Sequence, residues 1–238
     1  MNIQNSFFAP PLTGPLPHTC LRRNGEPEVC AEPVLTEHKA FVTVNGANTL
    51  ELTCLPQYLP ELVLGQLLSQ GYIRTKDDVQ ALRIDRDGQV SVTLHENPVP
   101  LRPVTPIPWK TEWVFALADR FAEGMPIHGA TFATHSCFLA KGRELLFGCE
   151  DIGRHNALDK AIGFALLSGI DLTGCLLYSS GRMPTDMVTK AIRAGIPVLV
   201  SKGSPTMGAV ALAQQYGLTL ICAARQDRMK QFSGTKPV

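Results

Sequence analysis

The feature of this sequence that most constrains the fold is a regular alternation of helical and apolar segments in its last third. In chain order, helical patterns and apolar runs cover residues 156–167, 175–178, 184–194, 198–200, 205–216 and 218–222. Gly169, Gly195 and Gly217 follow the three helical patterns, where a left-handed residue commonly ends a helix. Strands that alternate with helices of this length are joined by right-handed crossovers, so we expect an α/β unit with a largely parallel sheet.

The loops after the three apolar runs are the expected ligand site, because ligands bind beyond the carboxyl ends of parallel strands and beside helix N-termini. These loops cover residues 179–185, 201–206 and 223–228. Each loop contains basic side chains, and together they suit a phosphate or diphosphate. The alternative for any single loop is a capped turn whose basic side chain is only solvated.

A dense polar string, Glu150–Lys160, opens the first of these helices. A helix start needs one capping residue, and this string holds far more polar chemistry than that. Arg154 and His155 lie at the helix start and are candidate ligand contacts, together with Arg182 and Lys202 from the loops. The alternative for His155 is a structural histidine with a satisfied hydrogen bond.

Three units are predicted along the chain. Residues 1–36 hold six prolines without periodicity and predict an irregular arm. Residues 37–108 predict a small α+β domain, with two hairpins, a helix from Pro60 to Gly71 and a stiff proline-rich linker at 98–108. Residues 109–238 predict the α/β domain, which begins with an amphipathic helix at 111–122 and extended segments at 131–139 and 144–149.

Composition excludes several classes of protein. The 238 residues are 45% hydrophobic and 18% charged, which argues against disorder. The net charge of +1 gives no global field for nucleic acid or an anionic membrane. No apolar run reaches the roughly 18–20 residues that a membrane span needs, and the first residues do not resemble a signal peptide. We expect a cytoplasmic protein with no nucleic-acid or membrane partner.

The seven cysteines form no Cys-x-x-Cys pair, so in a cytoplasmic chain they are interpreted as free thiols. Cys175 and Cys222 lie in apolar runs and are expected to pack in the core. No metal site is predicted.

Residues 151–160, Asp-Ile-Gly-Arg-His-Asn-Ala-Leu-Asp-Lys, resemble the Asp-Val-Gly-Arg-His-Asn-Ala-x-Asp-Lys signature of the FdhD family of formate dehydrogenase accessory proteins. Further strings match in the same order along the chain, and the resemblance covers roughly residues 38–238. These strings are Val44-Asn-Gly46, Cys54-Leu-Pro56, Pro60-Glu-Leu62, Thr134-His135, Ser180-Gly-Arg182, Met187-Val188, Ala194-Gly-Ile-Pro-Val-Leu-Val200 and Ser204-Pro-Thr206.

The resemblance implies a cytidine deaminase-like three-layer α/β/α domain after a smaller α+β domain, often in a homodimer. It also implies a sulfur carrier, which takes a persulfide from a cysteine desulfurase. The sulfur passes to the molybdenum of the bis(molybdopterin guanine dinucleotide) cofactor before the cofactor enters formate dehydrogenase. The segment of the family that contacts this cofactor maps onto Ala223, Ala224, Arg225, Gln226, Asp227 and Arg228.

This chain differs from the family in the cysteine that would carry the persulfide. The family typically carries a Cys-Gly-x-Cys-Gly loop between its two domains, whereas the linker at 98–108 has no cysteine. Cys137 is the best remaining candidate, because His135 at i−2 on a strand shares its face and would lower the thiol pKa. The alternative is a buried strand cysteine. Cys149 is a weaker candidate because it adjoins the carboxylate of Glu150.

Three functions are therefore weighed. The first is a sulfur carrier with an unusual thiol, and the second is a chaperone that binds the cofactor or a guanine nucleotide without carrying sulfur. The third is a zinc deaminase, which needs His-x-Glu and Pro-Cys-x-x-Cys. Neither motif occurs in the sequence, so no zinc is expected.

Overall fold

The computed structural model describes residues 1–95 and 99–238, with only the backbone of Asn48 and Thr49. Its elements are β1 (Asn2–Asn5), β2 (Thr13–Cys20), β3 (Glu28–Leu35), β4 (His38–Val44), β5 (Ala47–Cys54), α1 (Leu59–Gln70), β6 (Val79–Ile84), β7 (Val90–Leu94), α2 (Thr111–Ala122), α3 (Pro126–Thr131), β8 (His135–Lys141), β9 (Glu144–Asp151), α4 (Arg154–Ser168), β10 (Leu176–Ser179), α5 (Thr185–Arg193), β11 (Val198–Ser201), α6 (Met207–Gln215), β12 (Thr219–Cys222) and β13 (Lys230–Ser233). The expected α/β class is confirmed, and the sheets are mixed.

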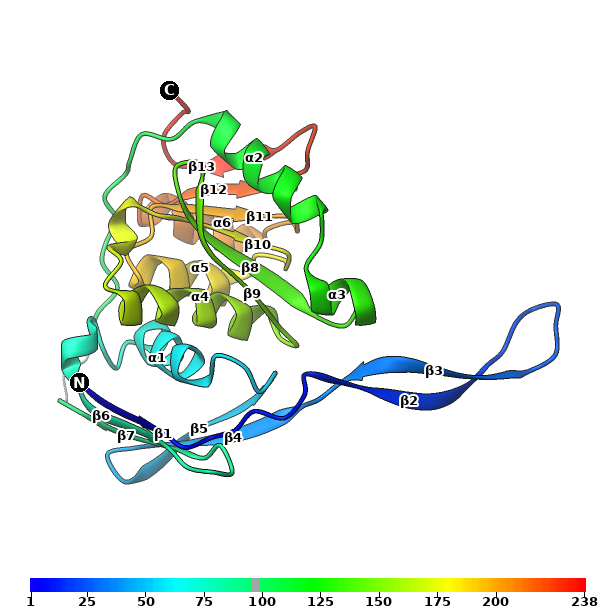
Figure 1. The fold of residues 1–238 in the computed structure, drawn as a ribbon. Helices are drawn as coiled ribbons and strands as arrows, with labels where there is room; N and C mark the ends of the chain where they lie inside the picture. The colour runs from blue at the N-terminus through cyan, green and yellow to red at the C-terminus, as the bar shows by residue number, and fades with distance from the viewer. Residues whose placement is uncertain (96–98) are drawn as a thin grey trace.

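The C-terminal sheet has the strand order β13-β12-β11-β10-β8-β9. As expected from the crossovers, β10, β11 and β12 are parallel, whereas β8, β9 and β13 pair antiparallel. Successive strand residues point to opposite faces. Leu177 and Leu199 therefore pack in the core on the side of α4, α5 and α6, while Tyr178 and Val200 pack in a second cluster with α2. The sheet thus lies between helices on both faces (Figure 1).

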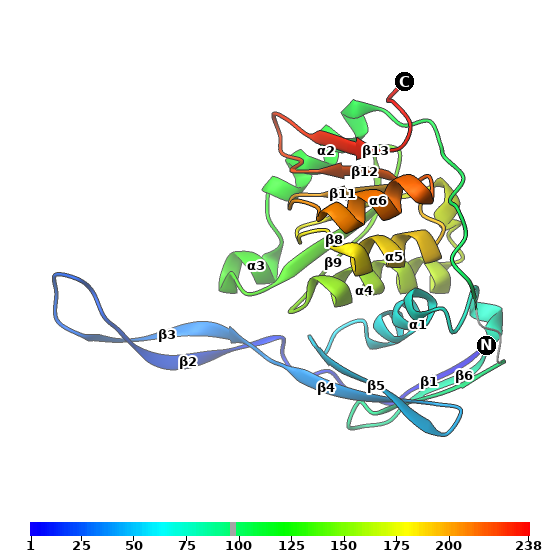
Figure 2. The ribbon, with the colours of Figure 1, turned by 180° about the vertical axis from the view of Figure 1, so that it is seen from behind.

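The N-terminal sheet has the strand order β1-β6-β7-β4-β5, and α1 lies between this sheet and α4 (Figures 1 and 2). Both expected hairpins form, β4 with β5 and β6 with β7. Buried side chains of both sheets belong to one continuous hydrophobic cluster. The small unit therefore keeps its own sheet but shares its core with the larger one.

Close helix packing joins the two units. A Cβ atom added to Gly65 of α1 would lie 1.8 Å from the carbonyl oxygen of Asp159 in α4. A Cβ atom added to Gly163 of α4 would lie 1.8 Å from the carbonyl oxygen of Glu61 in α1. Glycine is required at both positions because no side-chain atom fits between the two backbones.

The prediction of an irregular arm at residues 1–36 was wrong. β1 pairs in parallel with β6, and β2 and β3 form a long antiparallel hairpin. The prolines are tolerated because each strand of a two-stranded ribbon has one open edge, where a missing N–H breaks no ladder bond. Figures 1 and 2 show this hairpin extending away from the rest of the molecule.

The proline-rich segment runs along the body. The Val99 amide donates to the Gly71 carbonyl oxygen at 3.0 Å, and the Val104 amide donates to the Tyr216 carbonyl oxygen at 2.9 Å. Pro98, the first proline of the predicted linker, lies outside the described residues.

In the described part of the chain, each helix is too short or too polar to cross a bilayer.

Candidate functional site

Three loops meet at the carboxyl edge of β10, β11 and β12, as the alternating pattern predicts. The Lys202 amide donates to the Ser179 carbonyl oxygen at 2.9 Å, which joins the first two loops. The Ala223 amide donates to the Gly203 carbonyl oxygen at 2.8 Å, which joins the second and third. These bonds follow from the parallel register of the strands, so the loops form one connected rim.

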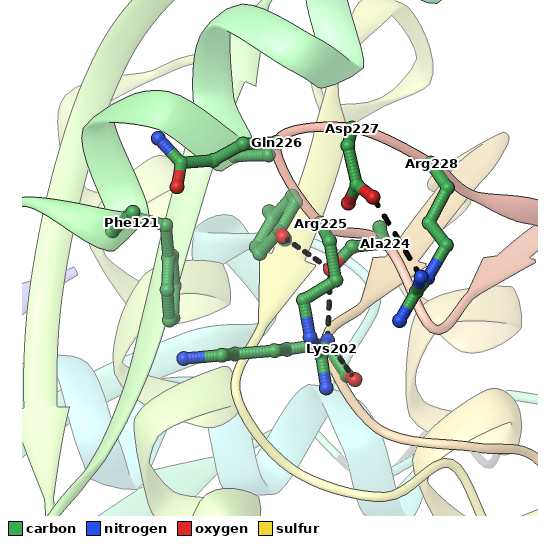
Figure 3. Close-up of a pocket in the computed structure, with 10 residues that line it drawn as sticks. Phe121, Lys202, Ala224, Arg225, Gln226, Asp227 and Arg228 are labelled. Carbon is green, nitrogen blue, oxygen red and sulfur yellow. Dashed lines mark hydrogen bonds and ion pairs between the residues drawn. The ribbon is translucent and has the colours of Figure 1, made fainter.

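A cavity of about 380 Å³ lies at this rim, between the loops and α2. The residues that line it are Ala118, Phe121, Ala122, Tyr178, Lys202, Ala224, Arg225, Gln226, Asp227 and Arg228. Figure 3 shows the labelled side chains around this space, with Phe121 on one side and the 224–228 loop on the other. Six of the predicted cofactor contacts therefore line one cavity.

The cationic side chains of the cavity differ in how firmly they are held. The Arg225 guanidinium donates to the carbonyl oxygens of Lys202 and Ala224, so it is fixed in place (Figure 3). Arg228 and Lys202 are exposed, and the Arg228 guanidinium pairs at 3.6 Å with its exposed neighbour Asp227. An exposed pair of this kind contributes little energy, so Arg228 can turn to an anionic ligand.

The wall of the cavity is aromatic. The Tyr178 hydroxyl donates to the Ala224 carbonyl oxygen at 3.1 Å, and burial raises the pKa of Tyr178 to about 12. Tyr178 therefore remains a neutral hydrogen-bond donor that fixes the loop. Phe121 packs against Tyr178 with ring centroids 4.8 Å apart. The sequence identified Phe121 only as the apolar side of a helix, and gave no signal that it borders a cavity.

Arg154 and His155 lie at the start of α4, on the adjacent part of the rim. Arg154 passes directly over the Ser180–Arg182 loop, since a Cβ atom added to Gly181 would lie 2.6 Å from its Cδ. Its Nε atom is buried and has no hydrogen-bond partner among residues 1–95 and 99–238. The His155 Nε2 lies 2.8 Å from the Asp186 carboxylate. Neither residue lines the cavity.

Ala223 and Arg182 also lie outside the cavity lining, although both belong to the rim. Ala223 has a left-handed backbone, with φ of 50°, and turns the chain into the 224–228 loop. Arg182 is exposed, and its backbone packs against Gly203. Arg182 and Lys202 therefore come from adjoining loops, and only Lys202 reaches the cavity.

His135 belongs to a hydrogen-bonded group close enough to Arg154 to sense its charge. Its Nδ1 lies 3.0 Å from the Ser180 hydroxyl oxygen, which also accepts the Ser136 amide at 3.0 Å. Burial lowers the pKa of His135, and the positive charge of Arg154 lowers it further. A neutral imidazole that accepts the serine proton at Nδ1 fits this environment.

Much of the Glu150–Lys160 string serves the fold. The Glu150 carboxylate accepts the backbone amides of Ile127 and His128, at 3.0 and 2.6 Å, and so holds α3. Asp151 and Lys160 form a fully buried ion pair of 2.6 Å. The excess of polar residues is thus explained largely by a junction between the two units, and only Arg154 and His155 face the rim.

Cys137 does not meet the requirement for a sulfur carrier, and this prediction is corrected. The side chain is fully buried, and burial raises the pKa of its thiol well above its usual value. His135 shares a face of β8 with it, but the imidazole interacts with Ser180. Cys149 is also buried, with a pKa raised to about 12. A buried thiol in an apolar environment is not an available nucleophile.

The sequence profile of the FdhD/NarQ family matches two overlapping segments of the chain, residues 35–103 and 94–238. The chain belongs to the FdhD/NarQ family. This FdhD chain is 30% identical over 239 residues to the sulfur carrier protein FdhD of Bacillus subtilis strain 168, an alignment that covers 88% of this chain and 91% of the relative. It is 26% identical over 233 residues to the sulfur carrier protein FdhD of Listeria monocytogenes strain F2365, with 84% and 89% covered.

The fold of this FdhD chain is similar to the crystal structure of a Desulfotalea psychrophila protein described as a formate dehydrogenase accessory protein. The TM-score is 0.84 at 28% sequence identity, and the match covers 94% of this chain and 98% of the other. The fold of most of the chain therefore has a solved relative.

Proposed function

We propose that this FdhD chain is a sulfur carrier that passes sulfur from a cysteine desulfurase to the bis(molybdopterin guanine dinucleotide) cofactor, before that cofactor is inserted into formate dehydrogenase. The names of the relatives support the sulfur-carrier role. The observation that carries the cofactor-binding part is the cationic, aromatic-walled cavity at the carboxyl edge of β10–β12. The reaction would take place in the cytoplasm, where formate dehydrogenase would be assembled.

The residues of the cavity fit a nucleotide diphosphate. Lys202 and Arg228 are exposed cations that can pair with phosphate oxygens, and Phe121 offers a ring against which a purine can stack. A cavity of about 380 Å³ accepts roughly one nucleotide, at the small end of ligand pockets. The bis-guanylyl cofactor has two such halves, so a homodimer with two cavities would match it.

Binding of GDP to the full chain tests the cavity, with titration calorimetry as the measurement. Lys202→Ala and Arg228→Ala should each weaken binding by about tenfold, because each removes one charge-assisted phosphate contact. Arg86→Ala is the matched control, since Arg86 is an exposed cation in the β6–β7 turn. Equal affinities for GDP in wild type and the three variants would show that the cavity is not the nucleotide site.

A second function, a cofactor-binding chaperone that carries no sulfur, is favoured by the burial of Cys137 and Cys149. Under this alternative GDP binds but no cysteine gains sulfur from a desulfurase. The zinc deaminase function has no support, because its two sequence motifs do not occur. The cytidine deaminase-like classification of the α/β domain remains a prediction.

A further inference from the structure

The accessible thiols of this chain are on the β2–β3 hairpin. All seven cysteines lie within the described residues and are free, and five of them are buried. The remaining two, Cys20 and Cys30, are partly exposed. Cys20 ends β2, and Cys30 lies near the start of β3. Sulfur transfer requires a thiolate that a donor can reach, so the choice of carrier falls on this hairpin.

The strand register places both thiols on one face of the ribbon. His18 pairs with Cys30, and Cys20 pairs with Glu28. Directly opposite residues share a face, and so do residues two apart on one strand. Cys20 and Cys30 are therefore diagonal neighbours, and the Cα atoms of such neighbours lie about 7–8 Å apart. His18 lies on the same face of the ribbon as both thiols, and its Nε2 lies 4.0 Å from the Glu32 carboxylate.

The hairpin is built to reach outward. Figures 1 and 2 show it projecting from the body on the side where β10, β11 and β12 end, which is the side of the cationic rim. A groove of about 720 Å³ separates its base, at Leu16 and Val34, from Thr131 and Ile152 of the body. The part that carries Cys20 lies beyond this groove, where another protein can approach it.

We propose that Cys20 and Cys30 are the thiols on which this chain carries sulfur, an inference that rests on the proposed sulfur-carrier function. In the loading step, a hairpin thiolate attacks the terminal sulfur of a persulfide on the desulfurase. The S–S bond of the donor breaks, a new S–S bond forms on the hairpin, and the donor cysteine leaves as a thiolate. One sulfur atom moves, and no external oxidant or reductant is needed.

The test uses the full reduced chain, a cysteine desulfurase and L-cysteine, followed by intact-mass analysis. The chain should gain about 32 Da for each persulfide. Cleavage after lysine and arginine separates the candidates, because Cys20 falls in peptide 1–22, Cys30 in 24–39 and Cys137 in 121–141. We expect the added sulfur in the first two peptides. Sulfur in peptide 121–141 would overturn the proposal.

Matched variants test whether sulfur is loaded on the hairpin thiols in particular or on any exposed thiol. The double variant Cys20→Ser/Cys30→Ser should lose the mass gain, while Cys137→Ala should keep it. Adding Ser91→Cys to the double variant places a thiol on the exposed face of β7, away from the hairpin, and this protein should stay unloaded. A mass gain in the double variant, or loading of the introduced thiol equal to wild type, would contradict the assignment.

The same variants distinguish this inference from the proposed function. In a strain without its own FdhD, wild type and Cys137→Ala should restore formate dehydrogenase activity, and the double variant should not. Full restoration by the double variant would reject the hairpin thiols and leave the carrier function standing. GDP binding without any sulfur gain in wild type would reject both and favour the chaperone.

Discussion

The Lys160 ammonium group lies 2.6 Å from the Asp151 carboxylate, and neither side chain is exposed to solvent. Asp151 also accepts the backbone amide of Leu55 at 3.2 Å and the side-chain amide of Asn156 at 2.9 Å. Leu55 belongs to the N-terminal unit, and Asn156 and Lys160 belong to α4. The most distinctive polar string of the sequence therefore forms a buried joint between the two units.

Replacing Lys160 by Met should reduce the free energy of unfolding by about 3–5 kcal/mol, because the Asp151 carboxylate is left buried without its counter-ion. Urea unfolding followed by circular dichroism measures this loss. Asp227→Ala is the control, since it breaks an exposed pair and should change stability by less than about 1 kcal/mol. Equal effects of the two substitutions would show that the joint does not depend on the buried charge.

Replacing Gly163 by Ala should destabilise the chain by about 1–3 kcal/mol or more, because the added methyl group collides with the backbone of α1. Gly129→Ala in α3 is the matched control. Its added Cβ meets no atom within 4 Å, so a neutral or slightly stabilising effect is expected. Thermal unfolding of both variants checks the difference. A tolerated Gly163→Ala would mean that α1 and α4 separate at little cost.

Stability should fall in mild acid partly through His135. Because burial and Arg154 lower its folded-state pKa, the unfolded state binds more protons below about pH 6.5. Its contribution is complete above the unfolded-state pKa and is lost as pH falls toward the folded-state value. His135→Gln should therefore lose less unfolding free energy than wild type between about pH 7 and pH 5. Identical losses in urea titrations at the two pH values would contradict this assignment.

Alkylation should distinguish the hairpin thiols from the rest. Cys20 and Cys30 are partly exposed, whereas the other five cysteines are buried, and burial raises the pKa of each of those five thiols. Iodoacetamide should label the two hairpin cysteines rapidly in the folded chain and all seven after denaturation. Time-resolved peptide mapping provides the measurement. Rapid labelling of Cys137 would show that β8 opens readily.

The helices and most strands could be predicted from periodicity and end signals. The helix at 111–122 coincides with α2, and the residues that end α1 and α4, Gly71 and Gly169, have the expected left-handed backbones. The six-residue α3 was missed, because a segment this short shows no helical period. It ends at Thr131, where the expected extended segment began, and the strand β8 begins only at His135.

The rim was predictable because parallel strands with helical crossovers must bring their carboxyl ends together. Which side chains of the rim line the cavity was not predictable from the sequence. Arg154, His155 and Arg182 were predicted as ligand contacts together with Lys202 and Arg228, but of these five only the last two line the cavity. Phe121 joins them from a helix far away in the chain, which no local pattern can indicate.

By itself, the sequence determined the order of helices and strands, the shared edge of the three loops and the family, because these depend on local spacing and residue type. Only the tertiary structure decided which polar groups are buried as a joint and which face solvent. It also decided which thiols are accessible: the packing of α4 buries Cys137, while the open ribbon of β2 and β3 leaves Cys20 and Cys30 within reach of solvent. Burial depends on neighbours that are distant in the chain, and it is burial that separates a reactive thiol from an inert one.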